Sequence, residues 1–323
     1  MKRLTTYSEI EFLESFFRSI PANPFESMVL NDNSDLQDWS SMLDIIYKNS
    51  ELYIENIETF VNKSKSNPFF QRLINDSNAG GSKIRETKFF KDLLENEICL
   101  TQFKPSGIHY YKNETSSCKL GVFTNSLKTW KNGIKSISAR KSYNVNKNKY
   151  LNNFPGWNIL KNTGLPINAA IISDRYFLKW NNSYKYNLFD LLVNLIPNDL
   201  KNTDFHLTII TSIEDYDNPM NYYQEINSFL KRKITPIVSF SLIAKPVREC
   251  PHDREIITNY YRLISGNSFD YYNKFGNIRY NTTLEYFAIN SETGNTHTLK
   301  LKEFKSLLEN AEYFGTGRNR LLN

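Results

Sequence analysis

The sequence contains very little cysteine. Only 3 of its 323 residues are cysteine, namely Cys99, Cys118 and Cys250, and no two of them have CxxC spacing. A disulfide framework uses paired cysteines, and a structural zinc site uses closely spaced cysteines and histidines. The sequence therefore predicts reduced thiols, no metal site and no cofactor.

Long apolar runs are also missing. No window approaches the roughly eighteen uncharged apolar residues that a membrane-spanning helix needs. Glu9, Glu11 and Glu14 lie where a signal peptide would have its apolar stretch. A composition of 40% hydrophobic and 23% charged residues is typical of a globular chain. We therefore expect no transmembrane segment, no secretion and a cytoplasmic location.

Acidic residues are absent from residues 115–173. By contrast, residues 1–114 carry 17 acidic and 13 basic side chains, and residues 174–323 carry 17 and 18. Basic residues interleaved with aromatic ones are typical of a surface that follows a phosphate backbone and stacks on bases, and a solvated loop is the alternative. We expect the seven basic residues from Lys128 to Lys149 to bind nucleic acid. The nine basic residues of the whole stretch are Lys119, Lys128, Lys131, Lys135, Arg140, Lys141, Lys147, Lys149 and Lys161.

Residues 1–98 are predicted to form a mainly helical region. Apolar residues recur at helical spacing in Tyr7–Phe17 and Asp35–Asn62, and further helices are expected at Asn67–Ile74 and Glu86–Glu97. No group of titratable side chains stands out in this region. We therefore expect it to pack internally or to bind a protein partner.

Residues 99–165 are expected to form a basic connecting region. Short apolar runs predict strands at Cys99–Phe103, Gly107–Tyr111 and Lys119–Thr124, and Leu127–Ile137 is expected to be helical. Clusters of Asn, Lys and Gly in Lys141–Thr163 predict a mobile loop.

Residues 166–323 alternate between predicted strands and helices. This order favours an α/β layered domain with its functional site at the carboxyl ends of the strands. A flexible basic end is expected at Gly315–Arg320. The predicted strands are Ala169–Ser173, Phe205–Ser212, Pro236–Lys245 and Asp253–Leu263, and the predicted helices are Asn187–Ile196 and Asn221–Lys233.

One motif in this last region could carry chemistry. Residues 250–259 read Cys-Pro-His-Asp-Arg-Glu-Ile-Ile-Thr-Asn, which reduces to H-x-R-x4-N. Strand residues two positions apart share a face, so His252 and Arg254 are expected to meet the same phosphate. A turn of small residues would bring backbone N–H groups close to the oxygens of that phosphate. These residues are Gly266, Asn267 and Ser268.

The motif resembles the phospholipase D signature H-x-K-x4-D. The resemblance implies a nucleophilic His252 with an imidazole oriented by Asn259, a second histidine as acid, and no metal. Two positions differ, because Asn259 stands where the family has Asp and Arg254 stands where it has Lys. The motif occurs once, so an active enzyme would need a homodimer that pairs two His252 side chains.

The string His-Asp-Arg-Glu-Ile is similar to one branch of that superfamily. The branch is the C-terminal phospholipase-D-like domain of eukaryotic proteins that carry a microtubule-interacting-and-trafficking domain. There the paired catalytic motif is lost and the fold binds phosphate-bearing ligands. The resemblance covers at most Asn168–Ile289. It implies that Asp174 and Arg175 contribute to the same phosphate site as Arg254 and the turn from Gly266 to Ser268.

The first functional hypothesis is a non-catalytic module that binds a phosphodiester or nucleic acid. Such a module would suit a recognition subunit of a bacterial defence or mobile-element system. One alternative is a dimeric, metal-independent nuclease or phosphodiesterase that uses His252. A second alternative is a binder of anionic lipid head groups.

Overall fold

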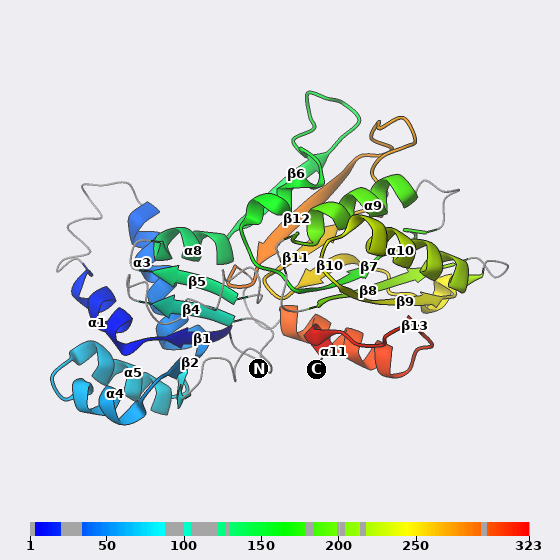
Figure 1. Ribbon diagram of the computed structural model, residues 1–323. Helices are drawn as coiled ribbons and strands as arrows, with labels where there is room; N and C mark the ends of the chain where they lie inside the picture. Colours follow the sequence, from blue (N-terminus) through cyan, green and yellow to red (C-terminus); the bar gives the residue numbers. More distant parts are fainter. Residues whose placement is uncertain are drawn as a thin grey trace. The chain divides into compact units, whose positions relative to one another are not determined.

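The computed structural model shows a mixed α/β protein that divides into two units, one ending at Ser138 and the other beginning at Ala139 (Figure 1). This division differs from the three regions expected from the sequence. In the part of the chain that the structure describes, no helix is both long and apolar enough to cross a membrane. The structure describes residues 4–20, 34–87, 100–104, 122–126, 129–178, 184–198, 200, 204–213, 218–291 and 296–322.

The N-terminal unit contains a parallel sheet with the strand order β3-β2-β1-β4-β5 among its described residues. Central strands of a parallel sheet are buried on both faces, and Thr5, Thr6, Tyr7 and Ser8 of β1 are all buried. The strands are β1 Leu4–Ser8, β2 Ser50–Ile54, β3 Lys83–Glu86, β4 Leu100–Lys104 and β5 Val122–Ser126. The helices are α1 Ile10–Arg18, α3 Ser34–Asp44, α4 Ile57–Ser64, α5 Pro68–Asn78 and α8 Trp130–Ile137, with a π-helical turn at Ile45–Asn49.

The prediction of a mainly helical first region is wrong in one respect, because it missed the strands. Helix α1 confirms the helix expected at Tyr7–Phe17, and α5 confirms the one at Asn67–Ile74. The single helix expected over Asp35–Asn62 is instead interrupted by β2. In β2 alternate residues are buried, which is the period of a strand, and pairing with β1 on one side and β3 on the other stabilises it. The helix expected at Glu86–Glu97 lies almost wholly outside the described residues.

An aromatic cluster ties α8 to the N-terminal unit. The ring of Phe16 lies 4.8 Å from that of Trp39 and 5.2 Å from that of Trp130, and the two tryptophans are 4.6 Å apart, between centroids. Aromatic pairs at these separations stabilise beyond the area they bury. Helix α8 therefore packs with α1 and α3, and the expected connecting region 99–165 is shared between the two units.

The C-terminal unit is built on a mixed eight-stranded sheet, counted over its described residues, with the order β13-β9-β8-β7-β10-β11-β12-β6. Strands β7, β8 and β9 are mutually parallel, and every other pairing is antiparallel. The strands are β6 Arg140–Val145, β7 Ala169–Ser173, β8 Phe205–Ser212, β9 Val238–Lys245, β10 Arg254–Thr258, β11 Tyr261–Ser265, β12 Thr282–Ala288 and β13 Phe314–Gly315.

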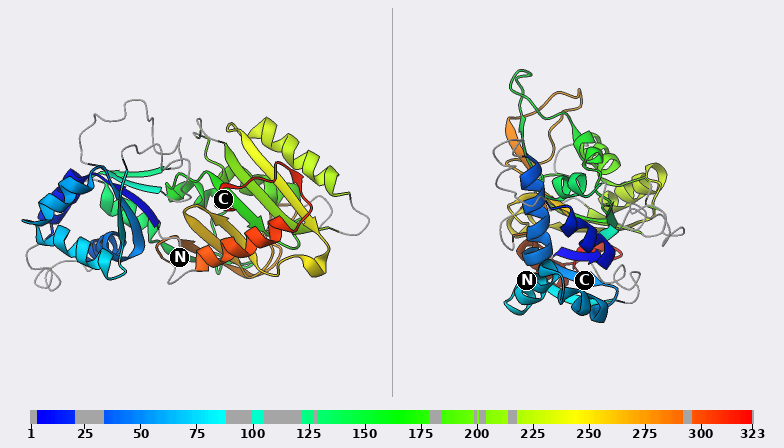
Figure 2. Two further views of the ribbon diagram at one scale, coloured as in Figure 1. Left: turned by 90° about the horizontal axis from the view of Figure 1, so that it is seen from below. Right: turned by 90° about the vertical axis from the view of Figure 1, so that its left-hand side faces the viewer.

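Helices cover both faces of this sheet. Helices α9 (Tyr184–Leu195) and α10 (Pro219–Lys233) lie on one face, and α11 (Thr296–Glu309) lies on the other (Figure 1, Figure 2). Strand β7 is accordingly buried along its whole length. Burial of an isoleucine such as Ile171 or Ile172, both with no exposed surface, stabilises the fold by about 1.5–3 kcal/mol each.

Most elements expected in the C-terminal unit are confirmed, with two corrections. The strand expected over Asp253–Leu263 is a hairpin, because β10 ends at Thr258 and β11 begins at Tyr261. The loop expected over Lys141–Thr163 begins with β6, which pairs with β12. Its later part packs into the core, where Trp157 is 1% exposed. A phospholipase-D-like fold stays a prediction.

The C-terminal segment is packed against the sheet, so the prediction of a flexible end at Gly315–Arg320 is wrong. The buried Asn319 side chain donates hydrogen bonds to Ala170 O and to Thr208 Oγ1, both at 3.0 Å. Gly315 has a φ of +108°, and a Cβ there would lie 2.1 Å from the carbonyl oxygen of Phe240. Glycine is required at this position because β13 approaches β9 so closely.

A buried histidine predicts acid sensitivity of the fold. His297 Nε2 lies 2.9 Å from Thr258 O, so Nε2 carries the proton, and burial lowers the pKa of His297 to about 4. The unfolded chain takes up a proton near pH 6.5 and the folded chain does not. The free energy of unfolding therefore falls as pH drops from about 6.5 to about 4, by ~3 kcal/mol for the full shift.

We expect His297→Gln to reduce the change in unfolding free energy between about pH 6.5 and about pH 4, measured by urea unfolding. His252→Gln is the matched control, because His252 is exposed. Equal slopes for wild type and His297→Gln would contradict the assignment.

Candidate functional site

One edge of the C-terminal sheet collects most of the residues singled out in the motif. The carboxyl ends of the parallel strands β7, β8 and β9 lie at this edge. Antiparallel pairing brings the start of β10 and the end of β11 to the same edge, since Arg254 pairs with Ser265 and Glu255 with Ser173. We call it the carboxyl edge. The sequence-predicted residues at the carboxyl edge are Asp174, Arg175, Arg254, Gly266, Asn267 and Ser268.

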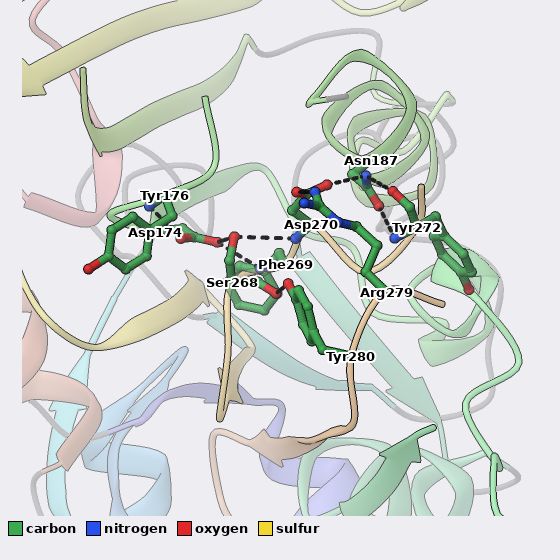
Figure 3. Close-up of polar contacts among 9 residues, drawn as sticks. All are labelled: Asp174, Tyr176, Asn187, Ser268, Phe269, Asp270, Tyr272, Arg279 and Tyr280. Carbon is green, nitrogen blue, oxygen red and sulfur yellow. Dashed lines mark hydrogen bonds and ion pairs between the residues drawn. The ribbon is translucent and has the colours of Figure 1, made fainter. Parts of the chain in front are cut away.

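The centre of the carboxyl edge is a buried carboxylate. Asp174 has no exposed surface, and its oxygens accept hydrogen bonds from Tyr176 N at 3.0 Å, Ser268 Oγ at 2.7 Å and Phe269 N at 2.7 Å (Figure 3). Burial raises the pKa of Asp174, and these hydrogen bonds together with the charge of Arg254 offset part of that rise. Asp174 therefore holds the turn after β11 in place, and its oxygens are directed at the protein's own donors.

A second set of hydrogen bonds fixes the rest of this turn. The buried Asp270 carboxylate accepts from Asn187 Nδ2 at 2.5 Å and forms an ion pair with Arg279. Asn187 also accepts from Tyr272 N at 2.9 Å, and the Tyr280 hydroxyl donates to Ser268 O (Figure 3). These residues were not predicted from the sequence, because Asn187 lies 83 residues from Asp270 and no local pattern connects them.

The small turn uses its N–H groups internally. Gly266 N donates to Thr283 O at 3.1 Å, and Asp270 N donates to Ser268 Oγ at 3.3 Å. A Cβ at Gly266 would lie 2.8 Å from Thr282 Oγ1, so the close packing against β12 explains the glycine. The backbone N–H groups of Gly266, Asn267, Phe269 and Asp270 are thus engaged within the protein, so they are not available to an anion.

Two arginines supply the positive charge of the carboxyl edge. The half-buried Arg254 lies over the Tyr176 ring, with Cζ 5.7 Å from the centroid, and it forms no ion pair with any described residue. Arg175 donates from Nη2 to Cys250 O at 2.6 Å. The Nε atoms of both arginines are buried without a hydrogen-bond partner in the described structure. Guanidinium groups of this kind suit the bidentate binding of phosphate oxygens.

His252 and Asn259 lie at opposite ends of β10. His252 is exposed and precedes β10, which begins at Arg254, so the two residues do not share a strand face as predicted. Asn259 follows the other end of β10, about 17 Å from Arg254 at the usual rise of a strand. Its buried Oδ1 accepts from Asn168 N at 3.2 Å. The prediction that Asn259 orients the His252 imidazole is therefore wrong.

The basic residues of the acid-free stretch are divided between the two units. Lys131 and Lys135 lie on α8 in the N-terminal unit, where Lys135 forms an ion pair with Asp38 at 3.2 Å. Arg140 and Lys141 lie on β6 in the C-terminal unit. The exposed lysines Lys147 and Lys149 follow β6, and Lys128 lies outside the described residues.

Carboxylates of the chain itself cap the corresponding edge of the N-terminal sheet. Glu55, just after β2, accepts from Ile10 N at the start of α1, at 3.0 and 3.3 Å. Glu86, the last residue of β3, accepts from Ile57 N at the start of α4 at 3.0 Å. A helix N-terminus attracts anions, and here these positions are filled by the protein. This is why we place the candidate site in the C-terminal unit.

The comparisons with known proteins give no match, either to a family model or to a curated protein. Over the described ranges, no group of three or more His, Cys, Asp or Glu side chains is placed to hold a metal ion.

We predict that Asp174→Asn destabilises the protein by about 1–3 kcal/mol, because the amide turns an –NH2 group toward an N–H or O–H donor that it cannot satisfy. Urea unfolding measures this difference. Asp190→Asn is the matched control, because Asp190 is exposed on α9. Equal unfolding free energies for the two variants would show that the buried carboxylate does not hold the turn.

Proposed function

We propose that the C-terminal unit binds phosphodiester groups of nucleic acid at its carboxyl edge and does not cleave them. The observation that carries the proposal is Arg254, a half-buried cation that has no ion-pair partner among the described residues. The charge of Arg254 acts on the nearby Asp174, but the two form no ion pair, and the oxygens of Asp174 accept three hydrogen bonds from other donors. Arg175 adds a second guanidinium at the same edge.

Binding without cleavage is supported by the state of the possible nucleophiles. The exposed His252 imidazole forms no hydrogen bond with another described residue, and Asn259 lies at the far end of β10. Burial raises the pKa of the Cys250 thiol to about 12, so this thiol stays protonated at neutral pH. A nucleophile of this type needs an activating base, and no such pair is assembled at the carboxyl edge in the described structure.

A binding module of this kind would serve as the recognition subunit of a bacterial defence or mobile-element system. The N-terminal unit, with its separate sheet and aromatic core, would then bind a protein partner. Both statements extend the proposal, which depends only on the carboxyl edge.

Replacement of the central arginine tests the proposal. We expect Arg254→Gln to weaken binding of an end-labelled oligonucleotide about tenfold, which corresponds to ~1.4 kcal/mol, and to lower the salt dependence of binding. Arg232→Gln is the matched control, because Arg232 is exposed near the end of α10, which leads back to the opposite edge of the sheet. Fluorescence anisotropy across a salt series in EDTA measures both effects.

The same samples separate the alternatives. Cleavage that is lost in His252→Ala would overturn the non-catalytic proposal and favour a dimeric phosphodiesterase. Equal affinities of wild type and Arg254→Gln for the oligonucleotide would show that Arg254 does not contact the nucleic acid. Binding to anionic vesicles without any binding to nucleic acid would favour a lipid head-group binder.

A further inference from the structure

Two neighbouring loops at the carboxyl edge expose large apolar side chains. One loop, residues 146–153, follows β6, and the other, residues 272–281, precedes β12 (Figure 1). Tyr150 is 98% exposed and Leu151 is 59% exposed on the first loop, and Phe275 is 75% exposed on the second. Apolar side chains exposed together on neighbouring loops mark a candidate binding surface.

The two loops present their aromatic residues in the same way. Each carries an Asn-Lys-aromatic tip, Asn148-Lys149-Tyr150 in the first and Asn273-Lys274-Phe275 in the second. Asn148 Oδ1 accepts from Tyr150 N at 3.0 Å, and Asn273 Oδ1 accepts from Phe275 N at 2.9 Å. The asparagine side chains therefore fix the backbone that carries each ring. We call these segments the aromatic tips.

The loops are held side by side. Val145 pairs with Thr282, and beyond this last pair Lys147 N donates to Asn281 Oδ1 at 3.0 Å. Asn281 O in turn accepts from the Asn267 side chain at 3.4 Å, which links the loops to the turn after β11. From β10 to β6 there are three strand spacings, roughly 14 Å. One short oligonucleotide can therefore contact both Arg254 and the tips.

The charge of the loops selects an anionic ligand. Residues 146–163 and 271–281 contain no Asp or Glu. Lys147, Lys149 and Lys274 are exposed, and Lys274 Nζ lies 5.0 Å from the centroid of the Phe275 ring. Lysines beside exposed aromatic faces match a ligand that alternates phosphates with flat rings. In a duplex the base faces are stacked on each other, whereas in a single strand they are accessible to aromatic side chains.

We infer that the aromatic tips stack on unpaired bases, so that the ligand of the carboxyl edge is single-stranded nucleic acid. This inference rests on the proposed function and names the substrate class of the same site. Tyr150 and Phe275 supply the stacking surfaces, and the tip lysines contact the adjacent phosphates.

The test compares four ligands of equal length and salt conditions. They are a single-stranded DNA, the RNA of the same sequence, the DNA duplex, and an abasic strand that keeps the phosphates without the bases. We expect the full-length protein to bind the single strands more tightly than the duplex and the abasic strand. The double variant Tyr150→Ala/Phe275→Ala should lose at least tenfold in affinity for the single strands and be unchanged toward the abasic strand.

Two controls keep the result interpretable. Tyr150→Phe retains a stacking ring and should bind like wild type. Tyr186→Ala removes another tyrosine, 60% exposed on α9, and should have no effect. Because all of these side chains are exposed, the variants should unfold at the same urea concentration as wild type.

The outcomes distinguish base stacking by the aromatic tips from the proposed binding of nucleic acid at the carboxyl edge. Loss of affinity in the double variant, confined to ligands with unpaired bases, supports the inference. Equal binding of abasic and base-containing strands, sensitive only to Arg254→Gln, would overturn the inference and leave the proposed function standing. No binding of any strand would overturn both. Loss of binding to anionic vesicles, with strand binding unchanged, would identify the tips as lipid contacts and overturn the inference.

Discussion

The buried carboxylate of Asp174 is the interaction on which the carboxyl edge depends. It joins the end of β7 to the turn after β11, two segments that are more than ninety residues apart in the sequence. A buried carboxylate is costly unless donors surround it, and Ser268, Phe269 and Tyr176 supply those donors. The same hydrogen bonds therefore have two effects. They hold the turn in place, and they stabilise the buried carboxylate. Pairing with β10 positions β11 relative to β7, and the hydrogen bonds of Asp174 then fix the turn that follows β11.

The same requirement decides which side chains at the edge can meet a ligand. Asp174 binds Phe269 N and the Ser268 hydroxyl, and the N–H groups of Gly266 and Asp270 bind other acceptors of the protein, so these groups contribute rigidity. Arg254 remains, with its guanidinium over the Tyr176 ring, and it forms no ion pair with any described residue. A rigid frame with a cation at its rim suits recognition of an anion. Acid–base catalysis would need an imidazole held by an orienting partner, and the described structure provides none for His252.

The two units use carboxylates at strand ends in different ways. In the N-terminal unit Glu55 and Glu86 cap the helices α1 and α4, so the positive helix ends are neutralised by the chain itself. In the C-terminal unit the carboxylates of Asp174 and Asp270 bind the turn between β11 and β12 instead. In the N-terminal unit the helix N-termini are therefore occupied by carboxylates of the chain. In the C-terminal unit the carboxylates fix a turn near Arg254, which has no ion-pair partner among the described residues. Both arrangements provide hydrogen-bond partners for polar groups of the protein. Only the one in the C-terminal unit leaves a positive charge, that of Arg254, available to a ligand.

The sequence by itself determined the elements whose apolar pattern is local. Strands β7 and β8 were predicted residue for residue, because short segments rich in apolar and β-branched residues are typical of strands. The resemblance of the motif to the phospholipase D signature predicted that Asp174, Arg254 and Gly266 share one site. The antiparallel pairing of β10 with β7 and with β11 brings them to the same sheet edge. Only the tertiary structure decided that the short β1 is a central strand, because five residues carry too little pattern to identify it and its position is set by pairing with β2 and β4. Tertiary contacts likewise turned Asp174 toward the protein, since the donors that surround it come from distant positions in the chain.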